Sequence, residues 1–351
     1  MERRLTTMAT MTHAPLVLIG NAKEGTVSVL RLAEGRLELI ASTLVGVGCA
    51  TFAVDRERDL VYCATKVPEP GVVTLRLDRE SGELAEVSRR AVGEHVAYLD
   101  LTRAGTVLLG ASYHGGWGRA WPVADGVLGE PTPKIEHRNL HCVVADDAGQ
   151  FAYFVSLGDD LVAQCAVAED GSLTPLDPPT VELPAGAGAR HLVLAGDETS
   201  AYLVTEFTGQ AFRLDRDPVT GVLAVAEAVG IVDPAAGLSV SRYGADPQAE
   251  HLIWGADVHL ADGRWLLCSE RSASTIATVV VGGDGRLGEV VALTSTETQP
   301  RGFGVAPDGR HVVVVGEASG AASLSRIEDD GRLTTLDRVE TGAGPNWVRF
   351  V

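Results

Sequence analysis

The residues Asp330-Gly331-Arg332-Leu333 form a turn signature that decides the fold, because the same pattern occurs seven times in the chain. Each copy has a polar residue, then glycine, any residue and leucine. The copies are Glu34-Gly35-Arg36-Leu37, Ser81-Gly82-Glu83-Leu84, Asp125-Gly126-Val127-Leu128, Asp170-Gly171-Ser172-Leu173, Thr220-Gly221-Val222-Leu223, Asp284-Gly285-Arg286-Leu287 and Asp330-Gly331-Arg332-Leu333. Their glycines are separated by 47, 44, 45, 50, 64 and 46 residues, so one unit carries an insertion, which residues 233–250 supply. Such a period indicates one folded unit per copy.

Alternating apolar runs flank each turn, for example Val27 to Leu32 before the first copy. Two strands joined by a turn with glycine in the left-handed conformation make a hairpin. A second turn, such as Asp146-Asp147-Ala148-Gly149, follows in several units and is itself followed by an apolar run, here residues 151–155. Four antiparallel strands per unit of about 45 residues predict an all-β, seven-bladed β-propeller. A β-sandwich or a pair of domains would not explain seven regularly spaced turns.

The two ends of the chain each provide an incomplete blade. Leu16 to Ile19 is an apolar strand without a partner, and the last repeat ends one strand short. Pairing these ends would close the ring and remove exposed edges. The sequence therefore predicts a propeller domain over residues 14–351, preceded by a flexible N-terminal tail over residues 1–13.

Composition and charge exclude several classes of protein. Hydrophobic residues make up 45% of the chain and charged residues 22%, which fits a globular protein with a large core. A net charge of −18 argues against binding to nucleic acid or to a membrane surface. No apolar run is long enough for a signal peptide or a membrane helix, so we expect a cytoplasmic monomer or homodimer. Five cysteines without CxxC spacing predict reduced core residues.

Polar residues recur at equivalent places in successive repeats. They stand where the innermost strands begin: Ala97-Tyr98-Leu99, Leu140-His141-Cys142, Ala189-Arg190-His191, Ala256-Asp257-Val258-His259, Pro300-Arg301-Gly302-Phe303 and Pro345-Asn346-Trp347. They also stand where the next strands end: Tyr113-His114, Glu206, Glu270-Arg271 and Glu317. Two such rings would face one cavity at a mouth of the channel. Histidine, carboxylate and arginine together suit the addition of water to an ester carbonyl.

A purely structural interpretation of these residues is also open. A histidine on a strand is commonly a hydrogen-bonded core residue, and Arg190 or Arg301 could be paired with Glu206 or Asp257 only to satisfy buried charge. A metal held by Asp257, His259, His141 and Glu206 would draw its ligands from distant repeats without a local metal spacing. We therefore expect no metal and no other cofactor. No GxSxG elbow, phosphate-binding loop or dinucleotide fingerprint is present, and Gly115-Gly116-Trp117-Gly118 is interpreted as a turn between blades.

Four runs resemble one known family. They are Gly186-Ala-Gly-Ala-Arg-His-Leu192, Trp254-Gly-Ala-Asp-Val-His259, Thr296-Glu-Thr-Gln-Pro-Arg-Gly-Phe303 and Gly342-Ala-Gly-Pro-Asn-Trp-Val348. These runs look like the propeller-type 6-phosphogluconolactonases, a family that also includes fungal carboxy-muconate cyclases. The resemblance extends from about Leu16 to Val351 and is more specific in the C-terminal half. It implies a seven-bladed propeller that hydrolyses a sugar δ-lactone, usually 6-phosphogluconolactone, a step of the pentose phosphate pathway.

The resemblance also implies which residues act. It gives catalytic positions to four residues: His141, Arg190, Glu206 and Arg271. Together with the two polar rings it suggests six substrate-binding residues: Tyr98, His114, His191, Asp257, His259 and Arg301. Arginines would hold carbonyl, carboxylate or phosphate oxygens, and either Glu206 or His141 would activate water. The chain has Glu270-Arg271 where family members often have Asn-Arg, which leaves the identity of the substrate open.

Three other functions remain as alternatives. A lactonising cyclase or isomerase would use the same proton-transfer and oxyanion groups. A sugar lactonase that depends on a metal would lose activity in a chelator. A propeller that serves only as an interaction platform would show Trp-Asp pairs closing its blades, and the sequence has none.

Overall fold

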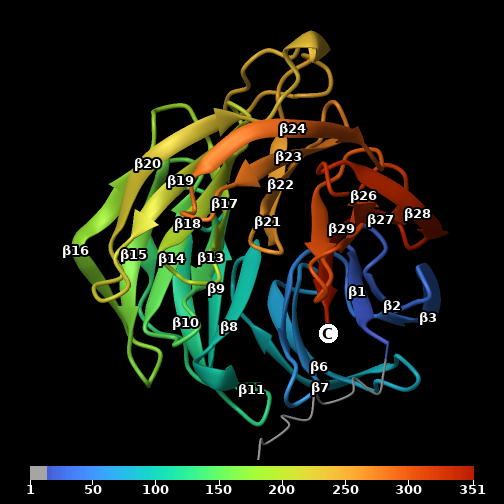
Figure 1. Cartoon of the computed structure of the whole chain (residues 1–351). Coiled ribbons are helices and arrows are strands. Elements are labelled where there is room, and N and C mark those ends of the chain that lie inside the picture. Colours follow the sequence, from blue (N-terminus) through green and yellow to red (C-terminus); the bar gives the residue numbers. More distant parts are fainter. Residues whose placement is uncertain (1–13) are drawn as a thin grey trace, which may run out of the picture.

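The structure is a computed structural model that describes residues 14–351. Seven antiparallel sheets stand around a common centre, and the chain passes once round the ring from blue to red (Figure 1). The predicted seven-bladed propeller is therefore confirmed. The predicted flexible tail falls on residues 1–13, which lie outside the described residues. In the part that is described, no helix has the length and apolar character that crossing a membrane requires.

The first three blades, each from its innermost strand outward, contain the two chain ends and the first third of the sequence. Blade 1 consists of β29 (Pro345–Phe350), β1 (Leu16–Asn21), β2 (Thr26–Ala33) and β3 (Arg36–Leu44). Blade 2 consists of β4 (Phe52–Asp55), β5 (Leu60–Thr65), β6 (Gly71–Leu77) and β7 (Leu84–Ala91). Blade 3 consists of β8 (Tyr98–Thr102), β9 (Val107–Ser112), β10 (Trp117–Ala124), β11 (Val127–Leu128) and β12 (Ile135–Glu136).

The other four blades follow in sequence order with the same internal arrangement. Blade 4 consists of β13 (Leu140–Ala145), β14 (Phe151–Ser156), β15 (Leu161–Val167) and β16 (Leu173–Glu182). Blade 5 consists of β17 (Ala189–Leu194), β18 (Ser200–Thr205), β19 (Gln210–Arg216) and β20 (Leu223–Gly230). Blade 6 consists of β21 (Gly255–Ala261), β22 (Trp265–Glu270), β23 (Thr275–Val281) and β24 (Leu287–Ser295). Blade 7 consists of β25 (Gly302–Val305), β26 (His311–Gly316), β27 (Ala321–Ile327) and β28 (Leu333–Glu340). Two 3-10 turns lie between strands, η1 (Arg103–Gly105) and η2 (Pro234–Ala236).

The repeated turn joins the third strand of a blade to its outermost strand in all seven blades. Its glycine has a positive φ in every copy, from 73° at Gly35 to 84° at Gly171 and Gly331. A residue with a Cβ is strained in this region, so the conformation explains why glycine recurs at this position.

The ring closes through the two chain ends. β1 pairs antiparallel with β29, and Val17 lies opposite Phe350 while Ile19 lies opposite Val348. These four side chains are buried in one cluster that also reaches β26. The innermost strand of blade 1 thus comes from the C-terminus, as expected from the sequence, and it pairs with the inner edge of β1.

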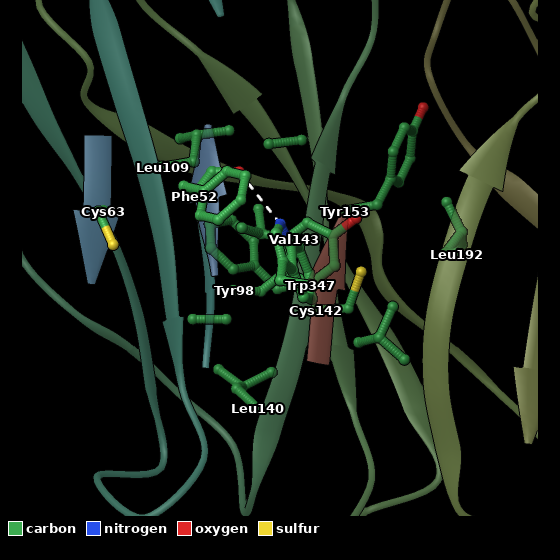
Figure 2. Close-up of a cluster of buried hydrophobic side chains, with 14 of the residues drawn as sticks. Phe52, Cys63, Tyr98, Leu109, Leu140, Cys142, Val143, Tyr153, Leu192 and Trp347 are labelled. Carbon is green, nitrogen blue, oxygen red and sulfur yellow. Dashed lines mark hydrogen bonds between the residues drawn. The ribbon is translucent and has the colours of Figure 1, made fainter. Parts of the chain in front are cut away.

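The innermost strands contact one another in order round the ring: β29, β4, β8, β13, β17, β21, β25 and again β29. The largest core cluster, drawn in Figure 2, combines side chains of several blades, among them Phe52, Tyr98 and Leu140. The Trp347 indole Nε1 donates a hydrogen bond of 3.2 Å to the Phe52 carbonyl and so links blade 1 to blade 2. All five cysteines are buried and free, as predicted.

Blade 3 departs from the regular pattern at its outer edge. Its outer edge is split, because β11 and β12 pair with opposite ends of β10. Pro131 and Pro133 lie between them, and proline cannot donate to a strand ladder. Gly115–Gly118, interpreted from the sequence as a turn between blades, lies instead within blade 3, where Gly115 and Gly116 end the connection from β9 and Trp117 and Gly118 begin β10, so that interpretation was wrong.

Candidate active site

A cavity of about 470 Å³ opens at one end of the channel, a volume typical of sites for small molecules. Its wall combines the starts of innermost strands with the segments that follow the second strands. Seven of the ten residues expected from the sequence line it: His114, His141, Arg190, His191, Glu206, Arg271 and Arg301. Tyr98, Asp257 and His259 are not part of the lining. The structure therefore brings together all four residues expected to be catalytic, while their roles stay predictions.

His141 and Arg190 owe their orientation to β-bulges. Leu140 and Cys142 pair with consecutive residues of β14, so His141 between them is the extra residue. Ala189 and His191 flank Arg190 in the same way opposite β18. A bulge removes a residue from the regular alternation and redirects its side chain. The two side chains can therefore face the cavity from strands whose neighbouring residues are buried.

Two arginines share one carboxylate oxygen in the wall of the cavity. Arg190 Nε donates to Glu206 Oε2 at 2.8 Å, and Arg271 Nη2 lies 3.1 Å from the same oxygen. Burial on its own would raise the pKa of Glu206, but the charges of Arg271, Arg190 and Arg301 outweigh it and lower that pKa. Glu206 is thus ionised. Within residues 14–351, its second oxygen receives no hydrogen bond, so it is open to a ligand.

Arg271 is fixed by contacts on several sides. Its guanidinium lies over the ring of Trp254, 3.7 Å from the centroid, and donates to the carbonyl of Gly255 at 3.2 Å. The neighbouring Glu270 accepts backbone N–H groups from Trp254, Ser272 and Ala273, between 2.6 and 3.1 Å. Glu270 therefore orders the loop that carries Arg271 and is not part of the cavity wall.

His141 is held without a hydrogen bond to any residue between 14 and 351. Its Nδ1 is buried and has no partner in this part of the chain. Burial, followed by the charges of Arg190, His191 and Arg301, keeps the pKa of His141 well below 6.5. The imidazole is consequently neutral near pH 7 and keeps a free lone pair for a proton.

A chain of polar contacts on the side of Arg190 away from the cavity opening holds its guanidinium in place. We call these residues the supporting layer. Arg190 Nη1 lies 3.2 Å from His191 Nε2, and since arginine can only donate, Nε2 is the acceptor. His191 Nδ1 therefore carries the proton and donates to Asp257 Oδ1 at 2.8 Å. Burial, and then the charge of Arg190, lowers the pKa of His191 to about 3, consistent with a neutral ring. Asp257 and His191 act as a support for the Arg190 guanidinium.

Tyr98 and His259, expected to bind substrate, pack below the cavity. The Tyr98 ring meets His191 edge to face at 5.2 Å, and its hydroxyl accepts from Arg349 at 3.2 Å. His259 Nε2 lies 3.2 Å from Asp257 Oδ2, and its ring packs on Phe303. Direct contact between substrate and Tyr98, Asp257 or His259 is therefore not supported by their positions, which place them in the supporting layer.

The remaining wall includes Arg301, which was predicted to bind substrate, and several residues that were not predicted as site residues. Arg301 lines the cavity 3.6 Å from Glu317, not beside Asp257 as the sequence allowed. Other lining residues not predicted as site residues include Lys23, Lys66, His95, Tyr113, Trp254 and Trp347. Lys23 and Lys66 follow β1 and β5, the second strands of their blades. Glu206 and Arg271 were identified because polar residues stand where the second strands end. The same rule, applied to blades 1 and 2, identifies both lysines.

The described residues contain no group of three or more His, Cys, Asp or Glu side chains placed to hold one metal ion. Of the four ligands considered from the sequence, Asp257 and His259 bond to each other below the cavity, whereas His141 and Glu206 are in its wall. These four residues do not form a metal site in this arrangement.

Comparison with known proteins agrees with the fold and the cavity. The family described as Lactonase, 7-bladed beta-propeller matches residues 8–350. The chain belongs to this lactonase family. A 6-phosphogluconolactonase of Sodalis glossinidius is 31% identical over 285 residues, which cover 80% of this chain and 82% of that protein.

Two solved structures share the fold of this lactonase family member. A Bacteroides fragilis protein superposes with a TM-score of 0.86 at 21% identity, covering 98% of this chain and 100% of its own. The periplasmic gluconolactonase of Pseudomonas aeruginosa superposes with a TM-score of 0.84 at 24% identity, covering 96% and 99%. At these identities the likeness shows the seven-bladed architecture and not the substrate.

Proposed function

We propose that the cavity hydrolyses a small sugar lactone of the 6-phosphogluconolactone type. The observation that carries this proposal is the meeting of a neutral imidazole, free of hydrogen bonds to residues 14–351, with two arginines bound to one carboxylate, in a cavity of small-molecule size. These groups are what ester hydrolysis needs: a proton acceptor for water and fixed positive charge for the oxyanion. The lactonases among the relatives support the same reaction class.

In this proposal His141 is the general base. It takes a proton from water as the water oxygen bonds to the lactone carbonyl carbon. The resulting tetrahedral oxyanion lies beside Arg190 and Arg271. The carbonyl then re-forms, the bond to the ring oxygen breaks, and the protonated His141 returns its proton to that oxygen. Water and lactone thus give the open hydroxy acid, and the enzyme ends in its starting state.

Glu206 has a different role in this proposal. Its Oε2 is already bound by two arginines, whose positive charges hold the carboxylate ionised, so this proposal assigns it to positioning and not to proton transfer. It holds both guanidinium groups in place and limits their mutual repulsion. His141 is preferred as the base because its Nε2 has no hydrogen-bond partner among the described residues and, unlike Nδ1, is not buried.

A panel of lactones tests the proposal. We expect the purified protein to accelerate hydrolysis of 6-phosphoglucono-δ-lactone well above the spontaneous rate, measured as acid release in a pH-stat. Muconate dicarboxylates belong in the same panel, because the cyclase alternative would act on them and leave sugar lactones unchanged. A protein that accelerates no sugar lactone would contradict the proposed function.

The pH dependence should report the state of His141. The neutral imidazole is the active form, so activity is lost as the pH falls through its pKa. Because that pKa is held well below 6.5, we expect kcat/KM to stay at its plateau from pH 7.5 through 6.5 and to fall only at lower pH. Arg301 contributes to lowering this pKa, so Arg301→Gln should move the acid limb to higher pH. A wild-type limb centred above 6.5 would contradict the assignment of His141.

Three further expectations stay predictions. We assign the catalytic unit to one propeller domain over residues 14–351. A cytoplasmic location is an expectation from the sequence, whereas one structural neighbour is named periplasmic. The monomeric or homodimeric state can be measured by light scattering.

A further inference from the structure

In each blade a short segment follows the second strand, and these segments form a ring around the cavity. The charges of their side chains differ from one side of the cavity to the other. Blades 5 to 7 provide Glu206, Arg271 and Glu317 at this level, whereas blades 1 and 2 provide Lys23 and Lys66. All five side chains line the same cavity. The carboxylates are confined to the side of blades 5 to 7.

The two lysines are unusual in this protein. The chain has only three lysines against 26 arginines, and two of the three line this cavity. Arg190, Arg271 and Arg301 each have a carboxylate partner in the wall. Neither Lys23 nor Lys66 forms an ion pair with any residue in the range 14–351. These two ammonium groups are therefore available to an anionic ligand, since no carboxylate of the described residues is bound to them.

The aliphatic stem of each lysine side chain lies against the backbone of a glycine, where a larger residue would leave no room for it. A Cβ added to Gly48 would come within 2.7 Å of Lys66 Cγ, and one added to Gly344 would come within 2.6 Å of Lys23 Cγ. Both glycines have positive φ, 84° and 68°. The lysine stems thus follow fixed surfaces next to the cavity, which limits the directions that their ammonium groups can take.

The topology places the lysines opposite the reacting groups. Blade 5 is three blades from blade 1 in one direction and three blades from blade 2 in the other, as the contacts between innermost strands show. Lys23 and Lys66 therefore face Arg190 and Glu206 across the channel. In a hexonic δ-lactone the carbonyl carbon and C5, which bears C6, flank the ring oxygen, so the carbonyl and the C6 group diverge from the two sides of that oxygen, and a phosphate on C6 extends its arm further away from the carbonyl.

We propose that Lys23 and Lys66 form a phosphate subsite that selects lactones with a phosphorylated C6 while the carbonyl lies at Arg190 and Arg271. This inference rests on the proposed function and goes further, because it names residues that decide between phosphorylated and plain sugar lactones. Two lysines suit a phosphate dianion because each ammonium carries one compact positive charge and donates N–H hydrogen bonds to the phosphate oxygens.

The test compares two substrates in three lysine variants. Lys23→Met and Lys66→Met keep the stem and remove the charge, and Lys134→Met is the matched control, since the third lysine packs over Trp117 outside the cavity. We expect each cavity variant to raise KM for 6-phosphoglucono-δ-lactone at least about tenfold, with kcat within about twofold of wild type. The KM for glucono-δ-lactone should not change, and Lys134→Met should behave as wild type with both substrates.

Product binding provides a measurement that does not depend on turnover. Calorimetry with 6-phosphogluconate and gluconate should show that the Lys23→Met/Lys66→Met double variant loses affinity for the phosphorylated acid only. An equal change in KM for both lactones, or unchanged affinity for 6-phosphogluconate, would overturn the subsite and leave lactone hydrolysis intact. If wild type turns over no lactone, the proposed function fails, and the calorimetry alone decides the subsite: absence of 6-phosphogluconate binding to wild type would overturn it as well.

Discussion

Replacement of His141 with alanine is expected to lower kcat for lactone hydrolysis at least about a hundredfold, the loss usual for a general base. The substitution removes the lone pair that receives the proton of water, whereas Arg190 and Arg271 still hold the carbonyl oxygen. KM should therefore change much less than kcat. The measurement is initial-rate kinetics on 6-phosphoglucono-δ-lactone, with the spontaneous rate subtracted at each pH.

The matched control is His311→Ala. His311 begins β26, which ends near Glu317, so it lies at the far end of the strand from the cavity, bonded to Asp308. We expect this variant to keep wild-type kinetics. Thermal unfolding of both variants separates a catalytic loss from a folding defect. Near-normal turnover by a folded His141→Ala protein would refute the mechanism.

The fold could be predicted from the sequence because a propeller is a series of local units. Each copy of the turn signature needs glycine at one left-handed position, seen at Gly35, Gly171 and Gly331, and each hairpin pairs residues that are close in sequence. The split edge of blade 3 follows from Pro131 and Pro133, whose effect is local too. A regular repeat that continues through these two prolines predicts one unbroken outer strand instead.

The site was only partly accessible from the sequence. Equivalent positions in different blades meet at one opening, which brought His141, Arg190 and Glu206 together correctly. Which polar side chain of a strand faces the cavity depends on bulges at residues 141 and 190, and a polar-apolar pattern does not reveal a bulge. Asp257 illustrates the difficulty: it was expected at the substrate, and the structure places it in the supporting layer beneath His191.

The lysines were missed for a different reason. Blade 2 has no charged residue at the start of its innermost strand, where Thr51 and Phe52 are buried, so nothing drew attention to Lys66, which directly follows the next strand. A single exposed lysine after a strand is ordinary at a surface turn. The closed ring shows that Lys23 and Lys66 border the same cavity.

Replacement of Glu206 with glutamine should also lower kcat at least about a hundredfold, for a reason other than proton transfer. The amide keeps the shape of the side chain and removes the charge that holds Arg190 and Arg271 together. Two buried guanidinium groups then repel each other, so we also expect a loss of stability of about 3–5 kcal/mol, as for a broken buried ion pair. Glu297→Gln is the control, because Glu297 is buried and paired with Arg338 away from the cavity.

The pH profile of this variant decides which residue is the base. If Glu206 accepted the proton, Glu206→Gln would abolish the acid limb of kcat/KM together with the activity. If His141 accepts it, the residual activity keeps an acid limb. Loss of the negative charge makes the cavity more positive and lowers the pKa of His141 further. The acid limb of this variant should therefore lie at or below the pH of the wild-type limb. A flat profile in Glu206→Gln with an intact limb in His141→Ala would transfer the role of base to Glu206.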